Sequence, residues 1–261
     1  MTKKSNSQEQ SKILRQSRAN RFVHWTTALS VMLLIITGLG QLPLYTRYNV
    51  TKLPGAEWLG NYFITINLHY LGAIGLIFAA SFHIVYAFAR REFDIFPRKG
   101  DMKESYQIIK AMLTKGQEPA SDKYLAEQRV AYLFIGLTLL LLVFTGLIKT
   151  LKNVPGVELS HSLLYWNTAL HNIGTVLIVF GIIGHLAAFI LKENRPLLPG
   201  MFTGFINREY IQHRHSLWYS KLIRNGEINE DKSEDSLTLP SRDNPTQEFH
   251  KQSDVGKSTP M

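Results

Sequence analysis

The chain contains no cysteine among its 261 residues. Without thiols it cannot form disulfides, attach a c-type haem, bind zinc through thiolates or hold an iron–sulfur cluster with its own side chains. Any iron–sulfur cluster that works together with this chain must therefore lie on a partner protein.

Charged residues are missing from four long stretches. No Asp, Glu, Lys or Arg occurs in residues 22–46, 58–89, 130–148 or 159–191. Each stretch can hold the roughly 20 apolar residues that a membrane-spanning helix needs. We therefore predict an all-α integral membrane protein, a four-helix bundle with spans near residues 22–42, 66–89, 130–149 and 168–191.

The chain is basic, with 29 Lys and Arg residues against 20 Asp and Glu residues. Only four of the 29 lie in or beside the loops that join the first span to the second and the third to the fourth: Arg47, Lys52, Lys149 and Lys152. The other 25 lie in the two tails and the middle loop, which is the positive-inside pattern and predicts both termini in the cytoplasm. Orientation and contact with membrane lipid explain the positive charge, so no nucleic-acid partner is expected.

The spans divide the chain into three parts. Residues 1–20 form a basic leader that we predict to be cytoplasmic and mobile, and residues 21–222 form the membrane domain. Residues 223–261 are charged and almost devoid of aromatic side chains, which predicts a disordered cytoplasmic tail.

Two segments outside the spans have helical character. Residues 101–113 carry apolar side chains at helical spacing, which predicts an amphipathic helix at the membrane surface; these are Met102, Tyr106, Ile109 and Leu113. Residues 207–223 are basic and aromatic, and predict a helix at the cytoplasmic interface.

Two of the spans each carry a pair of histidines fourteen residues apart, His69 with His83 and His171 with His185. Fourteen residues make just under four helical turns, so both side chains of a pair leave the same face, about 21 Å apart along the axis. Polar groups at membrane depth are costly and usually functional, and imidazole is a standard axial ligand of haem iron. Together with His24 the histidines fall into two levels, which indicates two stacked haems between the helices.

An internal repeat relates the spans. The first and third align at an offset of 108, so that Thr37-Gly38-Leu39 coincides with Thr145-Gly146-Leu147, and the second and fourth align at an offset of 102 with both histidines in register. This pattern indicates a duplicated helix pair. Symmetry alone would pair His83 with His185.

Two features of the repeat leave alternatives open. The repeat counterpart of His24 is Tyr132, which is not expected to be the second ligand of a bis-histidine haem. Gly72 and Gly174 lie one turn beyond the outer histidines. They fit either close helix packing or room for a flat porphyrin edge.

The segment Arg21-Phe22-Val23-His24-Trp25 resembles the first-helix Arg-x-x-His-Trp motif of respiratory di-haem cytochrome b subunits. These are the γ subunits of periplasmic formate dehydrogenases, with related subunits in uptake nickel–iron hydrogenases. The resemblance spans about residues 20–222 and includes three further histidines and the basic, aromatic stretch around His213, His215 and Trp218.

The resemblance implies a set of haem ligands. His69 and His171 would bind the iron of the haem b near the periplasm, and His24 and His185 that of the haem b near the cytoplasm. His83 would then be an extra polar residue that could hydrogen-bond a propionate, line a quinone pocket or replace His24 as a ligand.

The resemblance also implies a role in the bacterial inner membrane. An iron–sulfur subunit would pass electrons from a periplasmic catalytic dehydrogenase, formate dehydrogenase above all, to this membrane-anchoring subunit. The electrons would cross two haems b and reduce menaquinone or ubiquinone, and the complex could form a higher oligomer. No residue of this chain is expected to act as a catalytic acid, base or nucleophile.

One departure concerns the quinone site. Formate dehydrogenase subunits can carry an Asn-Ala-Gly segment before the third span, where this chain has Leu125-Ala126-Glu127. The candidates for quinone contact are therefore His83, Glu127, Gln128 and Arg129, although Glu127 and Arg129 also suit an ordinary solvated helix start. Other functions that remain open are a hydrogenase cytochrome b, a free-standing cytochrome b561-type quinone reductase, and a haem-free membrane transporter or assembly factor.

Overall fold

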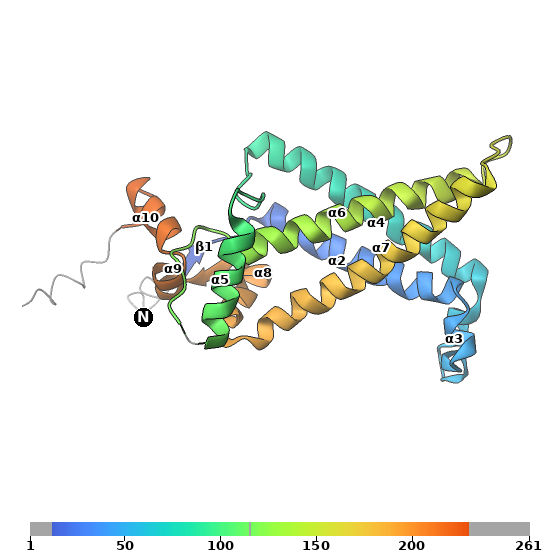
Figure 1. Cartoon of the computed structure of the whole chain (residues 1–261), viewed down its shortest axis with the longest axis horizontal. Helices are drawn as coiled ribbons and strands as arrows, with labels where there is room; N and C mark the ends of the chain where they lie inside the picture. Colours follow the sequence, from blue (N-terminus) through green and yellow to red (C-terminus); the bar gives the residue numbers. More distant parts are fainter. Residues whose placement is uncertain (1–11, 115, 230–261) are drawn as a thin grey trace, which may run out of the picture. The chain divides into compact units, whose positions relative to one another are not determined.

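The computed structural model describes residues 12–114 and 116–229. Four long helices run side by side (Figure 1): α2 (Arg18–Gln41), α4 (Tyr62–Arg90), α6 (Ala126–Leu151) and α7 (His161–Ala187). The shortest has 24 residues, about 36 Å at 1.5 Å per residue, which exceeds the roughly 30 Å of a bilayer's hydrocarbon core. Within the described ranges four helices are long and apolar enough to cross a membrane, which confirms the four predicted spans.

The spans begin four to seven residues earlier than predicted, and polar side chains cap three of them. The side chains of Ser17, Asn61 and Ser160 accept hydrogen bonds from backbone N–H groups in the first turns of α2, α4 and α7. Such caps satisfy amides that lack a partner within the helix. The helices therefore extend beyond the apolar stretches by which we located them.

Two helical hairpins make up the bundle, since α2 packs most closely on α4 and α6 on α7. An apolar cluster joins all four helices at mid-length, with Val31, Leu76 and Ile178 buried at its centre. Its members repeat between the hairpins: Val31, Leu34 and Leu76 correspond to Leu139, Leu142 and Ile178 at the offsets of 108 and 102. The same packing is thus built twice, which supports a duplication.

Gly72 and Gly174 also occupy equivalent positions. A Cβ atom added to Gly72 would lie 3.1 Å from Cγ of Leu34, and one added to Gly174 would lie 3.2 Å from Cγ of Leu142. These distances are too short for a comfortable contact between carbons. Of the two interpretations given above, the structure favours close packing within each hairpin.

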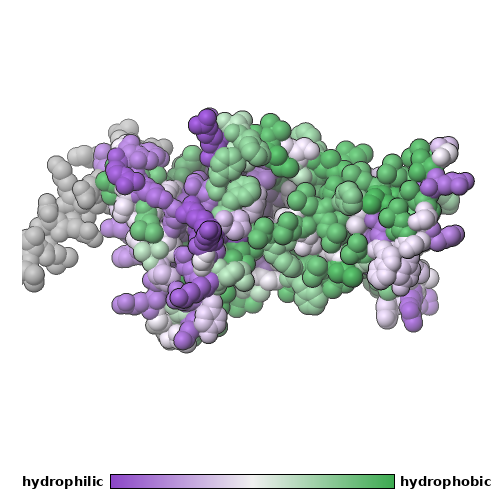
Figure 2. All heavy atoms as spheres, turned by 45° about the horizontal axis from the view of Figure 1, so that its top comes forward, coloured by the Kyte–Doolittle hydropathy of each residue, from purple (hydrophilic) through white to green (hydrophobic). Residues whose placement is uncertain are grey.

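The outer surface of the spans is apolar. In the most apolar windows of the four helices, only 11% to 22% of the residues are buried inside the protein. Figure 2 shows hydrophobic side chains covering the middle of the bundle, with hydrophilic ones beyond it. Apolar side chains on this scale need an apolar surrounding, as a lipid bilayer provides. The chain is a multi-pass membrane protein.

The two ends of the bundle differ. At the loop end, α2 connects to α4 through the short helix α3 (Leu44–Arg47) and the 3₁₀ helices η1 (Val50–Lys52) and η2 (Glu57–Gly60). The opposite end, where α2 begins and α7 ends, is called here the terminal end. It carries α5 (Asp101–Thr114), η3 (Ala188–Ile190), η4 (Lys192–Leu197), α8 (Leu198–Thr203) and α9 (Arg208–Arg214).

A small sheet at the terminal end corrects two predictions. Strand β1 (Lys12–Leu14) pairs antiparallel with β2 (Phe205–Asn207), so that buried Ile13 lies opposite buried Ile206. The fold is therefore mostly helical rather than all-α, and residues 12–20 are not a mobile leader. Residues 1–11 lie outside the described part of the chain.

The helix predicted over residues 207–223 is two helices, which corrects that prediction. α9 ends at Arg214 and α10 (Ser216–Arg224) follows, with His215 between them. The His215 ring is fully buried, and its Nδ1 donates a hydrogen bond to the carbonyl oxygen of Asp122 at 2.7 Å. This contact fixes the break between the helices.

Residues 222–261 form a second compact unit. Its described residues, 222–229, hold the last turn of α10 and a turn after it. Most of the predicted disordered tail, residues 230–261, lies outside the described part of the chain.

Helix α5 confirms the amphipathic helix predicted over residues 101–113. It lies across the terminal end of the bundle (Figure 1) and packs against α6 with Ile108, Ala111 and Met112. The predicted stripe of Met102, Tyr106, Ile109 and Leu113 is the exposed face of this helix. Asp101 fastens α5 to α6 by a bidentate ion pair with Arg129, at 2.6 and 2.8 Å.

Candidate functional site

The two histidines toward the loop end are held in the same way. His69 on α4 has its Nδ1 2.9 Å from Oγ1 of Thr37 on α2, and His171 on α7 has its Nδ1 2.8 Å from Oγ1 of Thr145 on α6. Each threonine comes from the other helix of the same hairpin. These two contacts are equivalent in the repeat, so one local structure positions both rings.

The hydrogen bonds also fix which ring nitrogen carries the proton. The hydroxyl of Thr37 donates to the carbonyl oxygen of Leu33 at 2.7 Å, and Thr145 donates to that of Leu141 at 2.7 Å. A hydroxyl has one hydrogen, so each threonine must accept a bond from the histidine Nδ1–H. The lone pair is then on Nε2, and such an outer partner is typical of a metal-ligating histidine.

The rings of His69 and His171 lie at one level. His69 and His171 occupy equivalent positions in α4 and α7, at the repeat offset of 102. The glycine after each threonine lies beside the ring, since a Cβ atom added at Gly38 or Gly146 would make an ordinary van der Waals contact with a histidine Cε1, at 3.5 or 3.6 Å. The repeated Thr-Gly thus holds one imidazole in each hairpin in an equivalent way.

At the terminal end, His24 on α2 faces His185 on α7. Their ring centroids are 6.3 Å apart, with 51° between the ring planes, and Nδ1 of His24 is buried without a hydrogen-bond partner among the described residues. Bonds from imidazole to a metal ion are about 2 Å long. Both rings can therefore bind a single ion between them, as a bis-histidine haem requires.

His83 is engaged elsewhere. Its Nε2 lies 2.9 Å from the hydroxyl of Tyr132 on α6, with the ring centroids 6.0 Å apart. In this structure His83 thus contacts Tyr132, whereas His185 faces His24. The repeat relates one hairpin to the other, so that His24 corresponds to Tyr132 and His83 corresponds to His185. The contact between His24 and His185 therefore corresponds to the contact between Tyr132 and His83.

The residues around His24 fix the start of its helix. Arg21 donates a hydrogen bond to the carbonyl oxygen of Phe202, and the Trp25 indole donates to that of Met201 at 2.9 Å. The Trp25 ring also packs on Phe202, with centroids 5.1 Å apart. In the Arg-x-x-His-Trp motif, Arg21 and Trp25 therefore anchor α2 to α8 while His24 faces into the bundle.

Residues 15–204 match the model of a protein family described as prokaryotic cytochrome b561. This match covers well over half of the chain. The chain belongs to the prokaryotic cytochrome b561 family. No curated protein matches it.

Membership makes this chain a membrane b-type cytochrome of electron transfer. The chemistry of the site agrees with haem b. A bis-histidine haem b takes two imidazoles as its axial ligands, and His24 and His185 of this cytochrome b561 face each other across the bundle. Among the described side chains, no three His, Asp or Glu residues gather as a site for a bare metal ion.

The three candidate quinone contacts in the first turn of α6 are Glu127, Gln128 and Arg129. Arg129 is 3% exposed and is held by Asp101, and the Gln128 side chain accepts a bond from Arg15 at 2.9 Å. Both residues stabilise the terminal end of this cytochrome b561. Both carboxylate oxygens of Glu127 are buried without a hydrogen-bond partner among the described residues.

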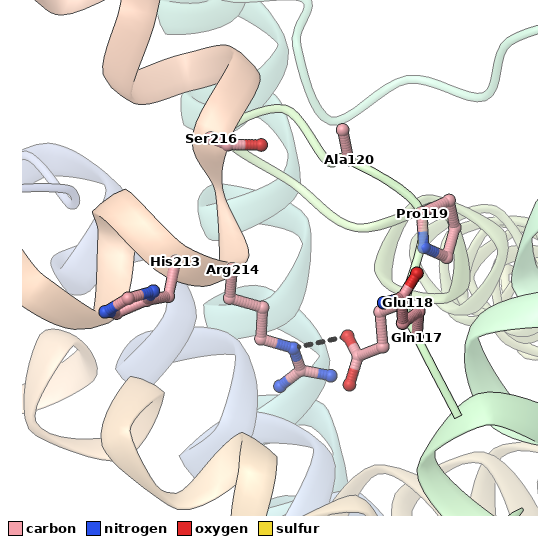
Figure 3. A pocket seen from close by; sticks show the side chains of 7 residues that line it. All are labelled: Gln117, Glu118, Pro119, Ala120, His213, Arg214 and Ser216. Atoms are coloured by element: carbon pink, nitrogen blue, oxygen red, sulfur yellow. Dashed lines mark hydrogen bonds and ion pairs between the residues drawn. The ribbon is translucent and has the colours of Figure 1, made fainter. Parts of the chain in front are cut away.

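A hollow of about 620 Å³ lies between the middle loop and α9, lined by Gln117, Glu118, Pro119, Ala120, His213, Arg214 and Ser216. Figure 3 shows Arg214 reaching Glu118, with 2.8 Å between Nε and the carboxylate. Arg214 also donates to Asn194 at 2.7 Å. These contacts occupy the charged groups of the hollow. We therefore assign the residues that line it a structural role, which is to join the middle loop to α9.

The middle loop is tied to α9 and α10 by charge. Burial would raise the pKa of Asp122, but hydrogen bonds from Lys221, the Lys123 amide and Arg98 outweigh it and hold the pKa at about 2. Burial, with a smaller contribution from Arg15, lowers the pKa of His215 to about 4. At neutral pH an ionised Asp122 and a neutral His215 therefore hold these segments together.

The sequence places the histidines in two levels but does not by itself show the residues that support them. Thr37 and Thr145 were noted only as part of the repeat, although a hydroxyl at equivalent positions in two apolar spans was a signal. Tyr132 was noted as the counterpart of His24. The contact of Tyr132 with His83 is the one that the repeat relates to the contact of His24 with His185.

Proposed function

We propose that this cytochrome b561 binds two haems b, one between His69 and His171 and one between His24 and His185. The observation that carries the proposal is that the rings of His24 and His185 face each other from the two hairpins, with their centroids 6.3 Å apart. Bound there, haem b supplies reversible one-electron chemistry. Family membership favours this function over haem-free transport.

The protein's own residues orient and insulate the two sites. Thr37 and Thr145 hold the outer imidazoles with Nε2 free to bind iron. The apolar cluster around Val31, Leu76 and Ile178 separates the two levels and keeps water and charge out of the space between them. Ligand identity, hydrogen bonding and burial are the means by which a protein sets haem potential.

The direction of electron transfer in this proposal follows from the orientation that the distribution of basic residues predicts. If the terminal end lies on the cytoplasmic side of a bacterial inner membrane, the pair of His69 and His171 lies near the periplasm. Electrons would then enter from an iron–sulfur subunit of a periplasmic dehydrogenase, with formate dehydrogenase as the first candidate. They would leave at the inner site, where His24 and His185 would hold the haem. Reduction of a quinone takes two electrons from this inner site and two protons from cytoplasmic water, one for each carbonyl oxygen.

Haem content and spectrum test the proposal. The purified chain should show the absorption bands of b-type haem in a reduced-minus-oxidised spectrum, and a haem assay should give two haems per chain. A chain without haem bands would instead support a transporter or assembly factor. One haem per chain would show that one of the two histidine pairs is not a ligand pair.

Because the chain lacks cysteine, single cysteines can report its orientation. Lys103 on α5 and Glu158 in the loop before α7 are both exposed. In spheroplasts, a membrane-impermeant maleimide should label Glu158→Cys and leave Lys103→Cys unlabelled. The opposite labelling would place the terminal end outside and reverse the proposed direction.

Affinity purification of the intact complex tests the partner. A molybdenum or tungsten subunit would support the formate dehydrogenase type, and a nickel–iron subunit would instead show a hydrogenase. Purification of the chain alone, with quinone-reducing activity, would show a free-standing reductase.

A further inference from the structure

The contact of His83 with Tyr132 has no part in the proposed haem ligation. It joins α4 to α6 at the terminal end, the level at which His24 faces His185. The repeat makes it the counterpart of that ligand pair, with a phenol in place of one imidazole. A side-chain pair in the membrane that is not needed for ligation is free to serve another ligand.

One nitrogen of His83 lacks a partner. Among the described residues the Tyr132 hydroxyl has no other acceptor, so its hydrogen is donated to Nε2 of His83, and the histidine carries its own hydrogen on Nδ1. That Nδ1 is buried and makes no hydrogen bond within the described chain. Buried donors nearly always have an acceptor, so the ligand for this site is one that carries an acceptor oxygen.

Aromatic rings lead from the outer surface of the bundle to this pair. Phe88 on α4 is 68% exposed, and its ring contacts Phe93, which contacts Phe96, which contacts Tyr132. The three centroid distances are 5.5, 5.7 and 5.5 Å, all edge-to-face. Such a row suits a planar apolar ring that enters sideways from lipid.

We propose that His83 and Tyr132 form the head-group site of a lipid-soluble quinone. The Nδ1–H of His83 donates to one quinone carbonyl oxygen, and the quinone ring lies near Phe96 with its apolar tail directed past Phe93 and Phe88 toward the bilayer. A quinone is the class of ligand that combines a planar ring, carbonyl acceptors and solubility in lipid. This inference rests on the proposed function, because the site needs the inner haem as its source of electrons.

The main test measures electron transfer to quinone. The purified protein is reduced with dithionite, mixed with decylubiquinone or menadione at several concentrations, and followed by the re-oxidation of its haem bands. Loss of a hydrogen bond to the quinone should slow re-oxidation about tenfold or more in His83→Leu at subsaturating quinone. Tyr132→Phe should slow it less, and both variants should keep two haems.

Tyr86→Phe is the matched control. Tyr86 lies on the same helix, and its hydroxyl contacts Ser17 at 3.3 Å. This variant also loses a phenol near the terminal end, and its re-oxidation should stay within about twofold of the unaltered protein.

A second readout does not depend on electron transfer. A photoreactive azidoquinone should label peptides that contain Phe93, Phe96 or Tyr132. The His83→Leu variant should lose this labelling, and decylubiquinone should compete with it. Labelling confined to other peptides would overturn the proposal.

Other outcomes also decide. Unchanged re-oxidation in His83→Leu would overturn the proposal. A shift of the inner haem's potential with unchanged quinone dependence would also overturn it, because it would assign His83 to a haem propionate. Loss of a haem in His83→Leu would overturn it by making His83 a ligand. If that variant does not fold, unchanged labelling and re-oxidation in Tyr132→Phe would overturn it. Absence of haem from the unaltered protein is a separate result, which would reject the proposed function itself.

Discussion

The Nδ1 atom of His69 lies 2.9 Å from the hydroxyl oxygen of Thr37, and the same arrangement recurs between His171 and Thr145. Each threonine fixes the proton of its imidazole on Nδ1 and leaves the lone pair of Nε2 for a metal. The two hairpins thus hold His69 and His171 in equivalent ways.

Replacing either threonine should weaken the outer haem site. Thr37→Val removes the acceptor for Nδ1–H while keeping the side-chain volume, and loss of such a partner typically costs about 10- to 100-fold in metal affinity. We expect faster transfer of one haem from the protein to an excess of apomyoglobin, and restoration by Thr37→Ser. Thr138→Val is the control, since Thr138 is also buried in α6 but bonds only its own helix. Equal haem transfer in the two valine variants would contradict the role assigned to Thr37.

The ion pair between Asp101 and Arg129 should stabilise the terminal end. Both side chains are 4% exposed, and breaking a buried pair costs about 3–5 kcal/mol because one charge is left without a partner. Asp101→Ala should lower the thermal unfolding midpoint and increase hydrogen exchange in residues 101–114. Asp101→Ala combined with Arg129→Met should be less damaging than Asp101→Ala alone. Glu104→Gln, which removes a partly exposed charge 3.9 Å from Arg129, should change stability by less than about 1 kcal/mol.

The buried ring of His215 should make the protein sensitive to acid. Its pKa is about 4 in the folded state, against an ordinary value of 6.5, so the unfolded chain binds the proton more readily. The stability from this group is complete above pH 6.5 and falls as the pH drops toward 4, by on the order of 3 kcal/mol in total. Unfolding midpoints between pH 7 and pH 4.5 should fall more steeply for the unaltered protein than for His215→Asn. Parallel pH profiles would show that His215 does not cause the dependence.

The four spans and the two histidine levels could be predicted because both depend on local pattern. A run of apolar residues long enough to cross a bilayer has few alternatives, and the fourteen-residue spacing places His171 and His185 on one helix face. The helix starts were missed, since Ser17, Asn61 and Ser160 extend the helices into polar sequence that hydropathy does not count. The short sheet was missed because Ile13 and Ile206 are far apart in the chain and each strand has only three residues.

The partner of His83 could not be read from spacing alone. Spacing along one helix places two side chains on the same face, but it does not say which neighbouring helix that face meets. The repeat offered two pairings, and only the arrangement of the hairpins shows that His83 meets Tyr132 while His185 meets His24. The family resemblance implies His24 as the partner of His185, and in the structure these two rings face each other.

The central claim, that His24 and His185 share one iron, is tested most directly by the haem content of two variants. His24→Ala should retain one haem b per chain and lose the spectral component of the inner haem, whereas His83→Ala should retain two. If His83→Ala loses the inner haem while His24→Ala keeps both, the pairing of His24 with His185 as haem ligands is contradicted.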